Sequence, residues 1–162
     1  PFGQHAASSG DGYHYVVART VGEAGVTVLD SVLILWTGAS TISNVVPTTF
    51  TVPNGGAQDF TFVVSDYLGH PLAKGTGISV SASVPPPPDP TTPVNQVQLG
   101  FGRQGTISFE RDYLFPGPGT TQFGFKLSDG TINIDQATPV SVSITVSGPN
   151  GTAYYTLNGI VR

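Results

Sequence analysis

The sequence predicts an all-β protein, and two observations support that prediction. Apolar and polar residues alternate with a period of two in segment after segment, and turn signals such as Asp129-Gly130 and Asn54-Gly55-Gly56 separate these segments. No stretch shows the period of an amphipathic helix. Regularly spaced short strands that are separated by such turns are typical of an antiparallel sandwich or barrel.

Six segments show the alternation most clearly, and each places its apolar residues on one face of a strand. The segments are 59–66, 77–85, 95–102, 105–112, 121–129 and 138–148. The residues that we expect on the inner faces of two sheets are Phe60, Phe62, Val80, Leu99, Phe123, Phe125, Val142 and Ile144. A chain of 162 residues is long enough for one such domain, or for one domain with an extension.

The composition narrows the class of protein. Charged residues make up only 10% of the chain, against roughly 25% in typical globular domains. The formal net charge is -4, and the chain has only 6 Lys and Arg residues. It therefore lacks the cluster of basic residues that binding to nucleic acid or an anionic membrane requires. Cys is absent, which excludes disulfides, thiolate metal sites and a Cys nucleophile. Met is absent too, so we expect a processed start at Pro1. Low charge, many Thr, Ser and Gly, and no sulfur favour an exported bacterial surface protein.

One segment is of another kind. VPPPPDPTTPVN (residues 84–95) cannot donate regularly to a β-ladder and favours polyproline II. A domain linker, a ligand for an SH3-type domain and a stiff loop are all compatible with this composition. Since the strands on both sides look like parts of one sandwich, we expect a loop at its edge.

The segment VVPTTFTVPNGGAQDFTFVVSDYLGHPLAKGTGISVSAS (residues 45–83) resembles the bacterial immunoglobulin-like repeats of invasin-type and adhesin-type surface proteins. The matching pattern is an apolar strand ending in VSD, the turn LGHPLAKGT and the alternating strand ISVSAS. The tail TPVSVSITVSGPNGTAYYTLNGIV (residues 138–161) looks like the last strands of such a domain. The resemblance implies an immunoglobulin-like antiparallel β-sandwich over residues 41–162, from which the Pro-rich loop 84–95 departs.

Residues 12–38 read as a strand, a Gly-rich turn and a second strand, like the closing hairpin of a preceding immunoglobulin-like domain. We therefore predict an N-terminal β-hairpin extension within residues 1–40. Its second strand holds an unbroken apolar run, Val32, Leu33, Ile34, Leu35 and Trp36, which is costly to leave uncovered. The run is either a central strand of the chain's own sandwich, or a strand that a neighbouring subunit completes, or part of a longer multidomain chain. In the second case these five residues form a subunit interface.

No catalytic or metal-binding motif is present, so we expect no enzyme activity, no metal site and no cofactor. His14 and Asp11 are expected on opposite faces of a strand, which disfavours joint metal binding. His70 lies in a turn beside Pro71, where a solvated side chain is the simpler interpretation. The acidic group Glu110-Arg111-Asp112 contains an Arg and therefore favours a solvated or ion-paired surface over a Ca²⁺ site.

Two surface features are candidates for other roles. Asn150-Gly151-Thr152 is a sequon for N-glycosylation in a turn, so Asn150 is a candidate acceptor. Aromatic side chains are candidates for a platform that stacks on sugars, although alternating aromatic residues are more often core or cross-strand pairs. Those residues are Trp36, Tyr13, Tyr15, Tyr67, Tyr113, Tyr154 and Tyr155. Tyr154 and Tyr155 are adjacent, so one of them should be exposed.

Together these observations predict a structural subunit of an extracellular or cell-surface bacterial filament or matrix. Copies of the chain would join head-to-tail by β-strand addition, in which backbone hydrogen bonds supply affinity. The alternative is a monomeric adhesive or carbohydrate-binding module whose partners are glycans or host and cell-surface proteins. Neither function uses nucleic acid or a membrane span.

Overall fold

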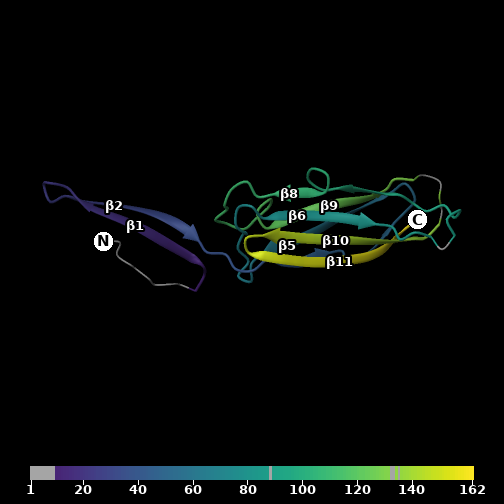
Figure 1. Ribbon diagram of the computed structural model, residues 1–162, viewed down its shortest axis with the longest axis horizontal. Helices are drawn as coiled ribbons and strands as arrows, with labels where there is room; N and C mark the ends of the chain where they lie inside the picture. The colour runs from purple at the N-terminus through teal and green to yellow at the C-terminus, as the bar shows by residue number, and fades with distance from the viewer. Residues whose placement is uncertain (1–9, 88, 132–133, 135) are drawn as a thin grey trace.

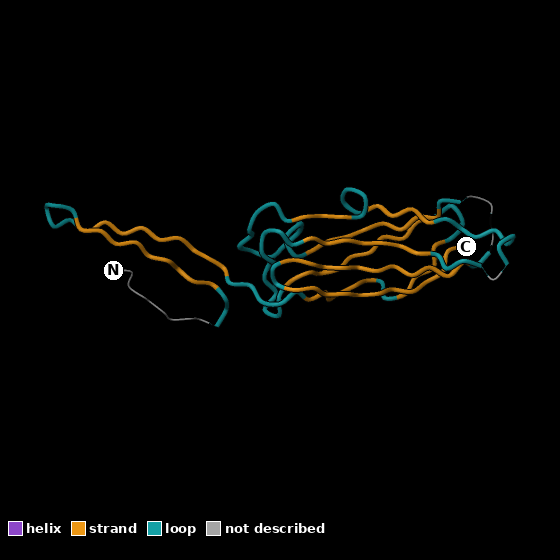
Figure 2. Tube along the Cα trace, viewed as in Figure 1, coloured by secondary structure: helices purple, strands orange, loops and turns teal. Residues whose placement is uncertain are grey.

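The computed structural model describes residues 10–87, 89–131, 134 and 136–162, and these residues form strands, turns and loops without a helix (Figures 1 and 2). The all-β prediction is confirmed. Accordingly, no described segment is a helix of the length and apolarity that crossing a membrane would need. The strands are β1 (Tyr13–Val21), β2 (Thr27–Leu35), β3 (Thr41–Val46), β4 (Thr49–Val52), β5 (Ala57–Ser65), β6 (Gly77–Ser83), β7 (Val97–Gly100), β8 (Thr106–Ser108), β9 (Gln122–Asp129), β10 (Thr138–Gly148) and β11 (Gly151–Val161).

Two sheets form the sandwich. One has the strand order β4-β11-β10-β6-β8, and the other has the order β3-β5-β9-β7. Neighbouring strands are antiparallel except β4 and β11, which run parallel. Two such sheets, packed on one core and joined by connections that cross between them, form an immunoglobulin-like sandwich.

The connection after β6 departs from the usual order of that fold. The Pro-rich segment 84–95 leads from β6 in the five-stranded sheet to β7 at the edge of the other sheet. The chain then returns to place β8 beside β6 before it crosses again to β9. The prolines cannot extend β6 as a ladder strand, so the chain leaves the five-stranded sheet where they begin.

The core lies between the two sheets and follows the alternation of the sequence. Of the eight residues that the sequence analysis places there, seven are buried, and Leu99 is partly buried against the same cluster. Phe60 and Phe125 face each other across β5 and β9 with ring centroids 4.5 Å apart. Tyr155 packs partly against the core whereas Tyr154 is 74% exposed, as their adjacency on a strand requires.

The edges of the sandwich are short or irregular. The edge strands β4, β7 and β8 have four, four and three residues. The longer edge strand β3 is interrupted by a register shift between Ser43 and Val46, where Asn44 has a φ of 50°. Short and bulged edge strands protect a sheet against unwanted pairing with another chain.

The β1–β2 hairpin is a separate two-stranded sheet that projects from one end of the sandwich (Figures 1 and 2). All nine residues of β1 pair with β2, and no strand of the sandwich pairs with either. The apolar run that begins at Val32 is therefore not a central strand of the chain's own sandwich. That alternative of the sequence analysis is wrong.

Candidate functional site

The hairpin presents two faces, which its register defines. Residues that stand opposite each other in an antiparallel pair point to the same face. The Arg19 face consists of Tyr13, Tyr15, Val17, Arg19, Val21, Thr27, Leu29, Ser31, Leu33 and Leu35. The Asp30 face consists of His14, Val16, Ala18, Thr20, Val28, Asp30, Val32 and Ile34. Each face is thus mainly apolar and carries one Asp, Glu, Lys or Arg residue.

The apolar side chains of both faces are open to solvent. On the Arg19 face, Tyr15 is 66% and Leu29 is 63% exposed, and on the Asp30 face Val32 is 57% exposed. Most of the exposed large hydrophobic side chains of the described residues lie on this hairpin or in the loops at its root. So many exposed apolar side chains on one element are unusual for a protein that is monomeric in water.

The hairpin formed by β10 and β11 shows what an ordinary hairpin of this fold looks like. Its inner face is apolar, with Val142 and Ile144 fully buried. Its outer face carries mostly Ser, Thr and Asn, including Ser143 opposite Thr156. The β1–β2 hairpin has no comparable polar face, so its sequence fits a strand pair that is covered on both sides.

Asp66 anchors the root of the hairpin to the sandwich. It lies in the turn after β5 and is only 2% exposed. Its Oδ1 accepts hydrogen bonds from the backbone N–H groups of Leu68 (2.8 Å) and His70 (2.9 Å). Its Oδ2 accepts one from the N–H of Gly38 (3.1 Å), which lies just after β2, and lies 3.3 Å from Nδ1 of His70. One carboxylate therefore orders its own turn and ties the hairpin's exit to it.

The charge of Asp66 is stabilised by these donors. Burial on its own would raise the pKa of this carboxyl, but the N–H groups of His70, Gly38 and Leu68 and the nearby His70 ring outweigh it. The net effect lowers the pKa of Asp66 below its ordinary value. The anchor is therefore an ionised carboxylate at neutral pH.

Tyr13, at the start of β1, attaches the hairpin on its other side. Its hydroxyl donates a hydrogen bond to the carbonyl oxygen of Leu114, and its ring stacks on Phe115 and meets the edge of His70 at 5.0 Å. Burial, with smaller contributions from Asp11 and Asp66, raises the pKa of Tyr13. The hydroxyl therefore remains a donor throughout the physiological range.

Gly12 permits this close approach. It has a φ of +79°, and a Cβ there would lie 2.9 Å from the carbonyl oxygen of Trp36 and 3.1 Å from Cε1 of His70. A larger residue would push β1 away from the sandwich, so the root of the hairpin depends on glycine at this position.

The sequon residue Asn150 holds the linker between the hairpin and the sandwich. Its Nδ2 donates hydrogen bonds to the carbonyl oxygens of Thr37 (3.2 Å) and Gly38 (2.9 Å) and also contacts the hydroxyl of Thr37. Glycosylation of Asn150 stays a prediction, and this geometry opposes it, because a glycan on that nitrogen would disturb these contacts.

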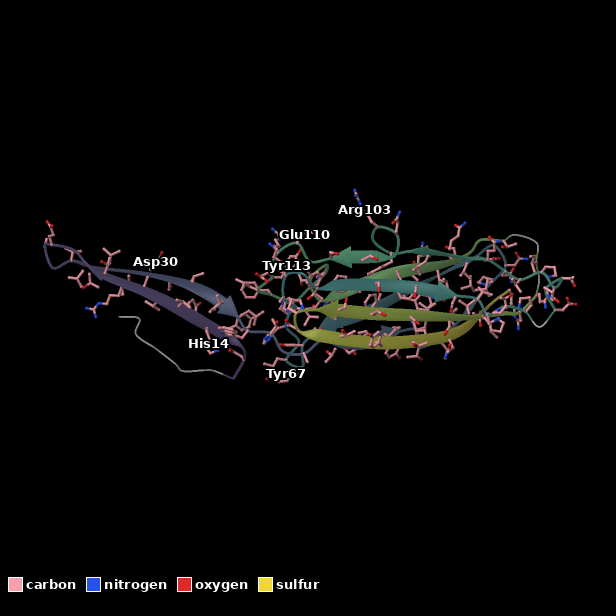
Figure 3. The ribbon with its side chains drawn as sticks, viewed as in Figure 1. His14, Asp30, Tyr67, Arg103, Glu110 and Tyr113 are labelled. Carbon is pink, nitrogen blue, oxygen red and sulfur yellow. The ribbon has the colours of Figure 1, made fainter. Side chains whose placement is uncertain are left out.

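Two shallow grooves flank the root. The first, of about 300 Å³, is lined by Trp36 and His14 from the hairpin and by Tyr67 and Leu68 from the sandwich. Figure 3 shows His14 and Tyr67 on either side of this junction. The second, of about 260 Å³, is lined among others by Leu33, Leu35, Leu72, Tyr113 and Leu114. The second groove continues the apolar surface of the hairpin onto the sandwich, whereas the lining of the first also includes the polar residues Thr37 and Asp66.

The structure distributes the five predicted interface residues over the hairpin and its root. Val32 and Trp36 are exposed, whereas Leu33, Ile34 and Leu35 are half-buried near the sandwich. The predicted interface did not include β1, whose residues Tyr15, Val16 and Val17 are also exposed. A second unbroken apolar run, YVV, was the signal that pointed to it.

The solvated His70 expected from the sequence is wrong. The side chain is buried between Asp66 and Tyr13, because the turn folds back against the root of the hairpin. Glu110 and Asp112 are exposed, and the backbone N–H of Lys74 donates to Asp112. Among the described residues, no group of three or more acidic or His side chains is placed to hold a metal ion.

Comparisons with known proteins give only distant similarities. No family model and no curated protein matches the chain. It is similar to domains 4 and 5 of the S-layer protein SbsC, at 12% identity and a TM-score of 0.41 over 98% of this chain and 81% of that one. The structure of rSbsC(31-844) is similar at 12% identity and a TM-score of 0.39, over 99% of this chain and 22% of the other. Murine CRIg is similar at 10% identity and a TM-score of 0.33, over 77% of this chain and 98% of the other.

Proposed function

We propose that the protein is a structural building block of an extracellular bacterial surface assembly, and that the β1–β2 hairpin is the element by which one copy joins another. The observation that supports this function is the hairpin itself. It is anchored to the sandwich at its root, is apolar on both faces, and is covered by no other described strand.

An isolated two-stranded hairpin is marginally stable in water, and partners that bury its apolar faces would stabilise it. Its outer edges also offer nine-residue stretches of unpaired backbone, far longer than the edge strands β4, β7 and β8. The sandwich protects its own edges while the hairpin leaves its edges open. This contrast favours the hairpin as the place where another copy adds by strand pairing.

A truncated chain tests the proposal. Residues 41–162 contain every strand of the sandwich, so they should fold without the hairpin but stay monomeric. Circular dichroism should show β-structure with a cooperative unfolding transition, and sedimentation should show loss of the assemblies that the full chain forms.

A point substitution gives the same test in the full chain. Leu33→Lys places a charge in the contact, where an unpaired buried charge is costly, and should abolish assembly. Thr156→Lys, on the polar outer face of β11, is the matched control and should assemble normally. A full chain that stays monomeric at high concentration would contradict the proposal.

A second candidate function, an adhesive or carbohydrate-binding module, is favoured by the groove between Trp36 and Tyr67. These side chains are 68% and 78% exposed and flank the same hollow, as aromatic residues do in sites that stack on sugar rings. Glycan binding by a monomeric chain, lost in Trp36→Ala and kept in Tyr154→Ala, would favour this function over the first.

Neither function requires a catalytic residue, a metal or a cofactor. We propose that the protein has none. Elemental analysis of purified protein should find no stoichiometric transition metal.

A further inference from the structure

We propose that the Asn150-Gly151 step is a site of spontaneous deamidation, and that this modification releases the linker between the hairpin and the sandwich. An Asn side chain is attacked most readily where glycine follows, because glycine has no side chain to hinder its backbone nitrogen. The sequence has three such steps, which begin at Asn54, Asn150 and Asn158. Asn150 stands where the linker meets the sandwich, so a change in its carboxamide acts on the direction of the hairpin.

The reaction needs no enzyme, and water is its only other reactant. The backbone nitrogen of Gly151 forms a bond to Cγ of Asn150, and the bond from Cγ to Nδ2 breaks. Nδ2 leaves as ammonia with the proton of the attacking nitrogen, and a cyclic imide remains. Water then adds to an imide carbonyl carbon and opens the ring, without oxidation or reduction of any atom. One direction of opening gives Asp, and the other gives isoaspartate, in which the main chain passes through the side-chain carbon atoms.

The product cannot hold the linker. Nδ2 of Asn150 donates hydrogen bonds to the carbonyl oxygens of Thr37 and Gly38. A carboxylate at this place only accepts hydrogen bonds, so its oxygens would face those carbonyl oxygens without a proton between them. Isoaspartate also lengthens the main chain of the turn, beside the carbonyl oxygen of Asn150 that accepts a hydrogen bond from the N–H of Ser40 (3.3 Å). Each product therefore removes contacts that fix the linker.

The docked linker also protects Asn150 from the reaction. Before ammonia can leave, Nδ2 has to give up its hydrogen bonds to Thr37 and Gly38, and Cγ has to meet the nitrogen of Gly151. Two hydrogen bonds of ordinary strength should make the reaction about tenfold slower than in a chain whose linker is undocked. Deamidation thus takes place mainly in molecules whose linker has come away, and it then prevents the linker from docking again.

An undocking variant of the full chain tests the protection. A Cβ at Gly38 would lie 3.1 Å from the ring of Tyr67, so the larger side chain of Gly38→Val should force the linker off its site. Peptide mapping by mass spectrometry, during incubation at mildly alkaline pH, should show that Asn150 is converted about tenfold faster in this variant. Asn54, in the exposed turn after β4, is the internal reference and should react at the same rate in both chains.

Two further variants separate undocking from the substitution itself. Gly12→Val crowds the carbonyl oxygen of Trp36 and loosens the root from the side of β1, so it should also speed the reaction. Gly22→Val lies at the hairpin tip, where a Cβ would be no closer than 3.8 Å to another atom, and should leave the rate unchanged. Equal rates at Asn150 in the unaltered chain and in both undocking variants overturn the protection. An Asn150 that stays intact in all of them while Asn54 is converted overturns the site itself.

An aspartate substitution tests the release. Asn150→Asp gives the full chain the carboxylate of the product from the start, and small-angle scattering in dilute solution should show a broader distribution of distances. Asn54→Asp carries the same change in charge in another turn and is the matched control. An unchanged distribution in Asn150→Asp overturns the release. None of these measurements needs contact between copies, so their failure leaves the proposed function standing, and a chain that stays monomeric leaves the deamidation standing.

Discussion

At the scale of single residues, Asp66 illustrates how one buried charge organises a junction. Its two oxygens accept hydrogen bonds from two N–H groups of its own turn and from Gly38 on the linker. Asn150, from the turn between β10 and β11, holds the same linker from the other side. The direction in which the hairpin leaves the sandwich therefore depends on a few polar contacts, together with the ring contacts of Tyr13, rather than on a large packed surface.

Substitution of Asp66 should be costly, and the cost should depend on pH. In Asp66→Asn, the amide NH₂ group replaces one carboxylate oxygen and faces a backbone N–H donor that has lost its acceptor. The free energy of unfolding should therefore fall by about 1.5–3 kcal/mol. Because the pKa of Asp66 is lowered by folding, its contribution is complete above the unfolded-state pKa of roughly 3.9 and is lost as the pH falls through the folded-state value. Urea unfolding at pH 6 and pH 3 should show a difference between the two proteins that shrinks in acid. A difference of equal size at both pH values would contradict this role, and Asp59→Asn, in an exposed ion pair, is the control.

At the scale of elements, β5 and β9 supply the aromatic centre of the core. Phe60 and Phe125 are a directly opposed cross-strand pair with nearly parallel rings, at an interplanar angle of 6°. Phe125→Ala should lower the free energy of unfolding by about 3–5 kcal/mol, through lost burial and the cavity left behind. Chemical denaturation measures this, and Tyr154→Ala, on an exposed aromatic, should change it little. An unchanged melting temperature for Phe125→Ala would mean that the pair does not hold the sheets together.

At the scale of the whole molecule, the hairpin and the sandwich form an elongated particle whose shape depends on the linker (Figure 1). Asn150→Ala removes the contacts to Thr37 and Gly38 but leaves the core intact. The sandwich should therefore unfold at nearly the same temperature, while the hairpin takes a wider range of orientations. Small-angle scattering should show a broader distribution of distances, whereas Asn158→Ala, on the outer face of β11, should leave the distribution as it is. A large loss of thermal stability in Asn150→Ala would instead assign this residue to the sandwich itself.

Much of the fold was predictable because alternation is a local property. The pleat of a strand sends successive side chains to opposite faces, so the sequence alone places Phe60, Phe62, Val142 and Ile144 in one core. The same rule shows that the run beginning at Val32 belongs to a strand without a polar face. These features need no knowledge of distant neighbours.

Only the tertiary structure decided which surfaces meet. The contacts that position the hairpin join Gly38 to Asp66 and Thr37 to Asn150, which are 28 and 113 residues apart in the chain. No local pattern encodes such contacts, and for this reason the burial of His70 was not predictable. The sequence predicts the hairpin extension but leaves open whether β2 is also a central strand of the sandwich. The sequence also did not predict that the Pro-rich segment leads from one sheet to the other. Proline ends a strand's hydrogen-bonded ladder, but it does not determine which strand the following residues pair with. Each strand's own backbone determines which side chains point to which face. What packs against each face is determined by the rest of the molecule and its neighbours.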